Sequence, residues 1–148
     1  MKLYYLNSLI GILEVGCENN KLISLKLANK AKKSDKKDDF IENIEKELDE
    51  YFKKERNSFD IKINPKGTNF QKTVWKKLLK IPHGKTKSYS EIAKEIGNKN
   101  AQRAVGSACN KNPIMIIIPC HRVISKSGKI SGYAYGDYVK EKLLSLEN

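Results

Sequence analysis

The residues best suited to chemistry lie together in the run PCHRV at 119–123. Cys120 is followed directly by His121 and Arg122, and neighbouring cations favour a thiolate, which predicts a cysteine pKa below its free value of about 8.5. A cysteine beside an apolar run is by default an inert buried residue, so a reactive and a structural Cys120 both stay open. On an extended strand Cys120 and His121 point to opposite faces, so they cooperate only if the chain turns at Pro119 or a water bridges them.

A histidine that acts as a base needs a partner that orients its ring, usually a carboxylate. The sequence does not by itself choose the partner of His121. The second half of the chain offers five carboxylates, which are Glu91, Glu95, Asp137, Glu141 and Glu147.

Metal and disulfide chemistry find little support in the composition. The cysteines Cys17, Cys109 and Cys120 are odd in number and widely spaced, which argues against a disulfide framework. With only two histidines, a four-ligand zinc site would be hard to assemble. We expect no metal, and we interpret Cys17 as a buried apolar residue.

The positive charge is concentrated in one half of the chain. The net charge is +12, and residues 1–64 hold 13 basic and 12 acidic side chains, whereas residues 65–148 hold 16 and 5. A lysine cluster is by default a solvated face. When a whole half of the chain has excess positive charge, however, its basic side chains repel one another unless a polyanion binds to them. We therefore expect nucleic acid as the partner of this half, with an acidic membrane surface as the alternative.

The first half, 1–64, has the pattern of a small α+β domain. Residues 3–27 alternate loosely between apolar and polar side chains, with turn-forming breaks, which predicts two or three short antiparallel strands. The charged stretch 31–39 predicts an exposed loop. Apolar residues recur at helical spacing over 40–52, and 59–63 alternates as a final strand.

The second half begins with signals for three helices. The spacing at 68–71 is that of a capping box, and an apolar stripe follows from Phe70 to Leu79. A second box at 88–91 opens a short helix, which Gly97 should end. A third helix over 101–109 then completes the outline of a helix-turn-helix, which is a DNA-binding motif.

Two further elements complete the predicted fold. The apolar run 114–118 predicts a buried strand, and a last helix is expected over 138–146. The predicted class is therefore mixed α+β. A small antiparallel sheet with one helix covers 1–64, and a mainly helical domain that contains the helix-turn-helix covers 65–148.

The last helix of the helix-turn-helix is unusually rich in small residues, among them Ala104, Gly106 and Ser107. Small side chains permit close approach, either to a neighbouring helix or to a DNA groove. Arg103 is the single long cation in this helix. The basic charge of this half favours the interpretation as a DNA contact.

Residues 70–147 resemble the catalytic domain of the O6-methylguanine-DNA methyltransferases, also called O6-alkylguanine-DNA alkyltransferases. The PCHRV core with RAVG upstream at this spacing is specific to that family. The first half resembles the small variable domain of such proteins only in kind. The matching stretches are 81–84 (IPHG), 88–89 (SY), 103–106 (RAVG), 112–113 (NP), 118–123 (IPCHRV), 132–133 (GY) and 140–141 (KE).

The resemblance implies four catalytic residues. Cys120 corresponds to the alkyl acceptor, His121 to a base linked to it through water, and Glu147 to the carboxylate that orients the histidine. Tyr89 corresponds to a tyrosine that helps to rotate the nucleotide out of the duplex and hydrogen-bonds the guanine ring.

The resemblance also implies which residues bind DNA. Arg103 corresponds to the arginine that fills the gap left by the extruded base. Asn112 corresponds to an asparagine that ties the recognition helix to the active-site strand. The small residues Ala104, Gly106 and Ser107 would approach the groove.

The implied substrate pocket includes Val123, Ala134 and Tyr135, and the backbone at Cys120, Val123 and Ala134 would face the guanine edge. The family often has serine at the position of Ala134, and glycine or tryptophan at that of Tyr135. Some relatives bind zinc in the small domain through residues that are missing here.

The implied activity is DNA repair by a methyltransferase. O6-methylguanine in double-stranded DNA would be flipped out, with contact through the minor groove, and its methyl group would move to Cys120. A thioether is not a leaving group, so each molecule would act once. We expect no cofactor, because no glycine-rich nucleotide loop is present. Activity on O4-methylthymine stays open. We also expect a cytoplasmic protein, because no signal peptide or membrane span is apparent. We expect it to act as a monomer.

Two other classes compete with this interpretation. A cysteine hydrolase would also use Cys120 and His121, but it would leave the basic half and the helix-turn-helix unexplained. A protein that only binds DNA, as alkyltransferase-like relatives do, would keep the DNA surface and lose the thiol. The presence of Cys120 argues against that class.

Overall fold

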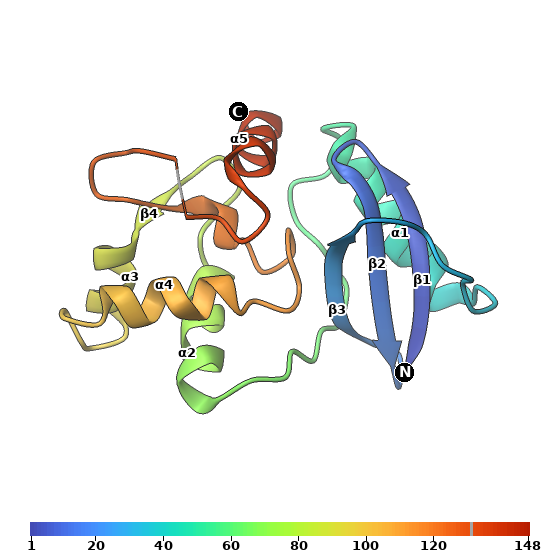
Figure 1. The fold of residues 1–148 in the computed structure, drawn as a ribbon, viewed down its shortest axis with the longest axis horizontal. Coiled ribbons are helices and arrows are strands. Elements are labelled where there is room, and N and C mark those ends of the chain that lie inside the picture. Colours follow the sequence, from blue (N-terminus) through green and yellow to red (C-terminus); the bar gives the residue numbers. More distant parts are fainter. Residues whose placement is uncertain (131) are drawn as a thin grey trace. The chain divides into compact units, whose positions relative to one another are not determined.

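The computed structural model describes residues 1–130 and 132–148, and the chain divides into two compact units, Met1–Pro65 and Lys66–Asn148. Figure 1 shows a sheet and a helix in the first unit and a group of helices in the second. The predicted mixed α+β class is confirmed, with an antiparallel sheet preceding the helices. Within the described residues, no helix combines the length and the apolar character that crossing a membrane requires.

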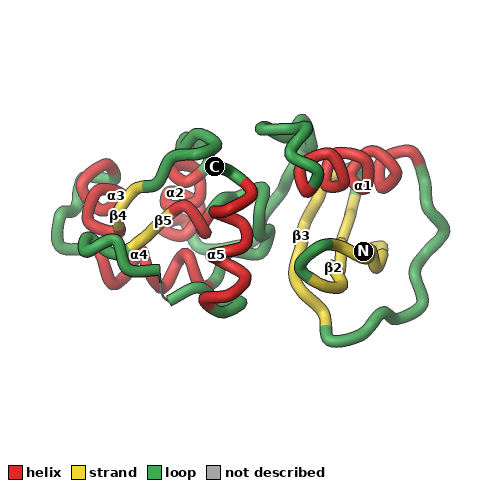
Figure 2. The backbone as a smooth tube through the Cα atoms, turned by 90° about the horizontal axis from the view of Figure 1, so that it is seen from above, coloured by secondary structure: helices red, strands yellow, loops and turns green. Residues whose placement is uncertain are grey.

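The first unit is built on three antiparallel strands, β1 (Lys2–Ser8), β2 (Gly11–Glu18) and β3 (Lys21–Ala28), in the order β1-β2-β3. Side chains along β1 alternate between buried and outward positions, as the period of two in a strand requires. Helix α1 (Asp39–Phe52) covers one face of this sheet (Figure 2), and the apolar side of the helix supplies the other half of the core.

The charged segment between β3 and α1 is exposed, as predicted, and it folds back along β1. The backbone N–H of Leu3 donates to the Asp35 carboxylate at 2.8 Å, and the Asp35 N–H donates to the Leu3 carbonyl at 3.0 Å. The Tyr5 N–H donates to the Ser34 hydroxyl at 3.1 Å. These bonds satisfy backbone groups of β1 on the side that has no strand neighbour.

The predicted strand over 59–63 is wrong. This segment makes only one isolated parallel bridge, between Ile63 and Leu22 of β3. The physical reason lies in a competing side chain: the Asp60 N–H donates to the buried Glu47 carboxylate at 2.8 Å, so the backbone is tied to α1 before it can form a ladder.

The second unit packs its helices around Trp75. Both predicted capping boxes are present, at Thr68 and Ser88, and Gly97 adopts φ +84 after the second predicted helix. The Trp75 indole donates to the Ala108 carbonyl at 2.9 Å, which ties the first helix to the third. The elements are α2 (Asn69–Leu78), β4 (Lys87–Ser88), α3 (Tyr89–Glu95), α4 (Gln102–Asn110), the 3-10 turn η1 (Cys120–Arg122), β5 (Val123–Ile124) and α5 (Asp137–Leu146).

The apolar stripe predicted for α2 is narrower than expected. Val74, Trp75 and Leu78 are buried, but Phe70 and Leu79 are 38% and 45% exposed. At 100° per residue the two exposed residues fall on opposite flanks of the buried arc, so the core does not reach them.

The predicted buried strand over 114–118 is also wrong. The run is buried, but it is a tight turn: the Ile117 N–H donates to the Met115 carbonyl at 2.8 Å, and the Ile118 N–H donates to the Ile114 carbonyl at 3.1 Å. Ile116 between them has φ 71, which is strained for a β-branched residue. An apolar run without periodicity does not distinguish a strand from a buried turn.

Candidate active site

The chain turns at Pro119, which is the condition for Cys120 and His121 to cooperate. Pro119 has φ −82 and ψ 63, and the Cys120 N–H donates to the Ile118 carbonyl at 2.8 Å, so the backbone reverses before η1 begins. Cys120 is only 4% exposed. Its sulfur lies 3.1 Å from the side-chain amide nitrogen of Asn112, which also donates to the Ile118 carbonyl at 2.8 Å. Asn112 therefore holds the thiol and the turn together.

The structure selects Glu147 from the five available carboxylates. Its side chain is 2.7 Å from Nε2 of His121. Arg122 donates to both oxygens of the same carboxylate, from Nε at 2.8 Å and from Nη2 at 3.0 Å, and its Nη1 donates to the Ile81 carbonyl at 2.7 Å. Such a two-pronged contact fixes the carboxylate in one orientation.

His121 is fully buried, and its surroundings favour the neutral ring. Burial lowers the pKa of His121, and Arg122 and Lys140 act in the same direction against the opposing effect of Glu147. Because Nε2 faces the carboxylate, it carries the proton of the neutral ring, and Nδ1 is an acceptor. Nδ1 has no hydrogen-bond partner within the described part of the chain. A buried acceptor of this kind can take a proton directly or through water.

The prediction that the pKa of Cys120 lies below its free value is wrong. Burial raises the pKa of the Cys120 thiol, although the hydrogen bond from Asn112 and the charge of Lys140 oppose this. The two neighbours in sequence do not stabilise the thiolate as expected, because Arg122 is bound to Glu147 and His121 is neutral. The thiol therefore needs a base to lose its proton.

Lys140 is the main residue that the sequence-based reasoning missed. It has no solvent exposure, its ammonium donates to the Val123 carbonyl at 2.7 Å, and it lies 5.9 Å from the centre of the Tyr89 ring. Burial lowers the pKa of Lys140, and the nearby thiols of Cys120 and Cys109 act against that change. One signal was available: Lys140 shares the apolar face of α5 with Val139 and Leu143.

Three tyrosines, Tyr89, Tyr133 and Tyr135, interact electrostatically with Cys120. Burial, followed by the charges of Cys109 and Cys120, raises the pKa of Tyr89 to about 12. Tyr135 is half-buried, and burial together with Cys120 raises its pKa to about 12 as well. The rings of Tyr133 and Tyr135 meet edge to face with centres 5.7 Å apart. Tyr133, like Lys140, had no predicted role.

The remaining predicted pocket and DNA-contact residues lie on different faces. Val123 is buried and Ala134 is exposed. On α4, the small residues divide: Ala108 packs inside, whereas Ala104 and Ser107 are exposed together with Arg103. Gly106 lies beside Tyr89, since a side-chain carbon there would be 3.8 Å from the Tyr89 ring.

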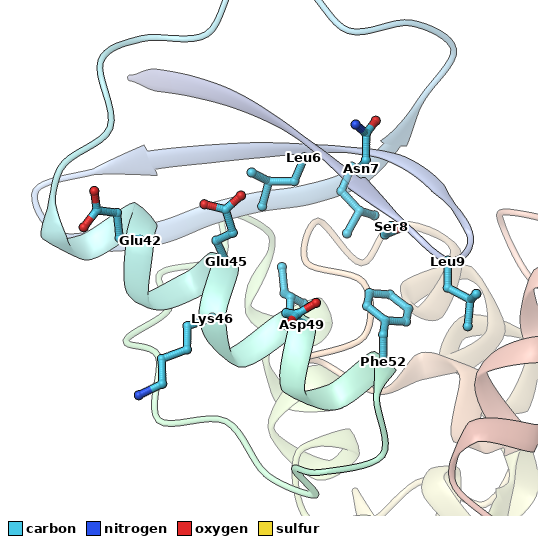
Figure 3. Close-up of a pocket in the computed structure, with 11 residues that line it drawn as sticks. Leu6, Asn7, Ser8, Leu9, Glu42, Glu45, Lys46, Asp49 and Phe52 are labelled. Atoms are coloured by element: carbon cyan, nitrogen blue, oxygen red, sulfur yellow. The ribbon is translucent and has the colours of Figure 1, made fainter.

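A hollow elsewhere in the molecule does not coincide with this cluster. It lies in the first unit between β1 and α1, has a volume of about 430 Å³, and is bordered by acidic and apolar side chains such as Glu42, Asp49 and Phe52 (Figure 3). None of its lining residues is a cysteine or a histidine. The geometry around Cys120 therefore defines the candidate site better than the size of a cavity does.

Comparison with known proteins identifies the family of the chain. Residues 69–148 match the DNA-binding domain of 6-O-methylguanine DNA methyltransferase, and residues 1–65 match its ribonuclease-like domain. The methylated-DNA–protein-cysteine methyltransferase of Methanosarcina acetivorans is 54% identical over 110 residues, which are 74% of this chain and 70% of that protein.

Solved structures extend the similarity across the whole chain. The O6-methylguanine methyltransferase of Mycobacterium tuberculosis is 40% identical with a TM-score of 0.90, covering 99% of this chain and 92% of that one. A structure of the same protein in complex with DNA is 41% identical with the same score and coverage. The chain belongs to the 6-O-methylguanine DNA methyltransferase family.

Proposed function

We propose that this protein repairs DNA by moving the methyl group of O6-methylguanine to the sulfur of its own Cys120. The observation that carries the proposal is the buried series Cys120, His121 and Glu147, in a chain whose relatives are named methylated-DNA–protein-cysteine methyltransferases. O4-methylthymine also carries its methyl group on a base oxygen, so it is a second candidate substrate.

Proton transfer prepares the nucleophile. The Cys120 thiol gives its proton, through a bridging water, to Nδ1 of His121, and Glu147 stabilises the imidazolium that results. The hydrogen bond from Asn112 and the charge of Lys140 stabilise the thiolate. The raised pKa of the thiol makes this base necessary.

Methyl transfer then follows in one displacement. The sulfur of Cys120 forms a bond to the methyl carbon as the bond between that carbon and the guanine oxygen breaks. The leaving guanine carries the electron pair, and a hydrogen bond from the Tyr89 hydroxyl stabilises it. The product thioether is neither hydrolysed nor displaced, so one protein molecule repairs one base without a cofactor.

Helices α3 and α4 act in this proposal as a helix-turn-helix that meets duplex DNA at the minor groove. The exposed small residues Ala104 and Ser107 permit close approach, and Arg103 enters the duplex in place of the flipped nucleotide. Flipping costs a few kcal/mol, which these contacts offset. The complex of the related M. tuberculosis protein with DNA supports binding to DNA.

The pocket for the flipped base is formed by Val123, Ala134 and Tyr135, with Asn112 joining α4 to the turn that carries Cys120. Binding and chemistry both belong to residues 65–148, and the protein acts as a monomer. Residues 1–64 form the small variable domain.

Intact-mass spectrometry after mixing with DNA that contains O6-methylguanine tests the proposal. We expect a gain of about 14 Da, one methylene, confined to Cys120, and no more than one product per protein. Cys120→Ala should bind the same DNA and gain nothing. Repeated turnover by the unmodified protein, or a methyl group on another residue, would overturn the mechanism.

A further inference from the structure

A row of lysines follows the exposed side of α2. Lys72 and Lys76 lie on α2, and Lys80 lies two residues beyond its end; the three are spaced four residues apart and all are exposed. We call these three residues the α2 lysine row. They belong to a stretch, 61–90, that contains eight lysines and no aspartate or glutamate. The row therefore has no acidic neighbour along the chain.

The α2 lysine row stands on a rigid support. The opposite side of α2 is buried through Val74, Trp75 and Leu78. The indole of Trp75 donates to the Ala108 carbonyl of α4 at 2.9 Å. The lysines are thus fixed relative to the helix that we propose contacts the damaged nucleotide.

Folding alone does not account for this arrangement. Within the described residues, no carboxylate lies within 4.0 Å of the three ammonium groups, whereas lysines near α1 are paired, as Lys37 is with Glu45. Like charges four residues apart on a helix repel each other. Lys76 gains from the negative end of the helix dipole, but Lys72 lies near the positive end, where a cation is unfavourable.

We propose that the α2 lysine row is a second, sequence-independent contact surface for the phosphates of the bound DNA duplex, distinct from the surface of α4. This inference rests on the proposed function. Lys72 and Lys76 lie about 6 Å apart along the axis of α2, and Lys80 follows in the turn after the helix. Each DNA strand offers a phosphate about every 3.4 Å along the duplex axis, so every lysine of the row can reach one. The lysines whose mutual repulsion destabilises the free protein would then stabilise the complex.

The salt dependence of DNA binding tests the proposal on the full chain. The triple variant Lys72→Gln, Lys76→Gln, Lys80→Gln removes the row. A matched control removes three exposed lysines of the first unit by Lys30→Gln, Lys32→Gln and Lys33→Gln.

Binding to an undamaged duplex is measured against salt concentration. We expect the slope of log affinity against log salt to fall by about 2–3 in the row variant and by less than about 1 in the control. Equal slopes in the row variant and the unmodified protein, or equal losses in both variants, would overturn the proposal.

A single substitution separates binding from folding. Lys72→Glu places a carboxylate near the positive end of the helix dipole and four residues before Lys76, so the melting temperature should stay the same or rise. DNA affinity should nevertheless fall more than in Lys32→Glu, the charge-matched control. A parallel fall of stability and affinity would show that Lys72 has a structural role, and the proposal would fail.

Methyl transfer at saturating DNA distinguishes the proposed repair function from the proposed DNA contact of the α2 lysine row. The row variant should still accept one methyl group on Cys120, because the row does not touch the reacting atoms. If the unmodified protein accepted no methyl group yet the slopes differed as expected, the repair function would fail and the DNA contact would stand. If the row variant and the unmodified protein had equal salt slopes and methyl transfer were intact, the proposed DNA contact would be wrong and the repair function would stand.

Discussion

Each unit of the molecule buries one glutamate close to one arginine, and the two sites differ in what else they hold. In the first unit, Glu47 accepts from the Asn43 side chain at 2.9 Å and from the Asp60 N–H at 2.8 Å, and Arg56 lies 3.4 Å away. In the second unit, Glu147 accepts from Arg122 and faces His121.

The comparison shows which property distinguishes a buried ion pair in a candidate active site from one with a structural role. The partners of Glu47 are a side-chain amide, a backbone N–H and a guanidinium, and they tie a loop to α1. Glu147 contacts an imidazole whose Nδ1 has no partner among the described residues and whose sequence neighbour is a thiol. A buried ion pair is by itself weak evidence of anything but structure. The titratable group with an open acceptor is what distinguishes the second site.

Among the substitutions that test this comparison, Glu147→Gln should have the largest effect on methyl transfer. His121 would lose the carboxylate that orients it, and loss of a general base typically slows a reaction about 10²–10⁴-fold. Leaving Arg122 buried without its partner should also cost about 3–5 kcal/mol of unfolding free energy. Single-turnover methyl transfer and urea unfolding, followed by the fluorescence of Trp75, measure the two losses.

Glu47→Gln is the matched control in the first unit. It should destabilise the protein less, by about 1–3 kcal/mol, because Arg56 is partly exposed and keeps solvent as a partner. The folded fraction should transfer methyl groups at the normal rate. An equal loss of transfer in both variants would mean that the effect of Glu147 is only one of folding.

Lys140→Met sharpens the comparison by removing the buried cation beside the thiol. The Cys120 thiolate would lose a stabilising charge, so the pKa of Cys120 should rise and methyl transfer at neutral pH should slow several-fold. The rate should recover as the pH is raised, which a purely structural defect would not allow. Lys142→Met, two residues along α5, should leave the pH profile of single-turnover transfer unchanged.

Tyr135→Gly should have a smaller effect, confined to large alkyl groups. The Tyr135 ring packs against Tyr133, and in the proposed pocket it should narrow the space for the transferred alkyl group. Free O6-benzylguanine should inactivate the unmodified protein slowly and the variant faster, with little change for the methyl group. Rapid inactivation of the unmodified protein would show that Tyr135 does not restrict the pocket.

The smallest expected effect is on stability against pH. The pKa of His121 is lowered in the folded protein, so near pH 6.5 the unfolded chain binds a proton that the folded protein does not. Stability is therefore retained above the unfolded pKa and lost as the pH falls below it, by at most about 1.4 kcal/mol per unit.

Urea unfolding between pH 7.5 and 5.5 should show this loss, and His121→Asn should flatten it. The first unit contains no histidine, so the substitution changes only the second unit. A slope that persists unchanged in the variant would place the titrating group elsewhere.

Local signals in the sequence were sufficient for the helices. The two capping boxes and Gly97 are short-range chemistry, and the structure places each where it was predicted. The runs 59–63 and 114–118 were wrong as strands because their backbone partners come from distant side chains or from turn geometry. Neither source leaves a periodic pattern in the sequence.

The candidate site shows the same limit. Cys120 and His121 stood out as neighbours, but the choice of Glu147 depends on how α5 packs against η1. The sign of the Cys120 pKa shift depends on burial, which a linear sequence does not reveal. Lys140 was overlooked because a lysine on an amphipathic helix is normally solvated, and only tertiary packing turns this one inward.

The hydrogen bonds between β1 and the loop residues Ser34 and Asp35 have a consequence for self-association. An edge strand with free backbone groups is a template on which another chain can add a strand and begin to aggregate. Here the charged loop before α1 occupies that edge through Leu3 and Tyr5, and its lysines surround it with positive charge. A segment that looks like a mere linker thus protects the sheet from intermolecular pairing.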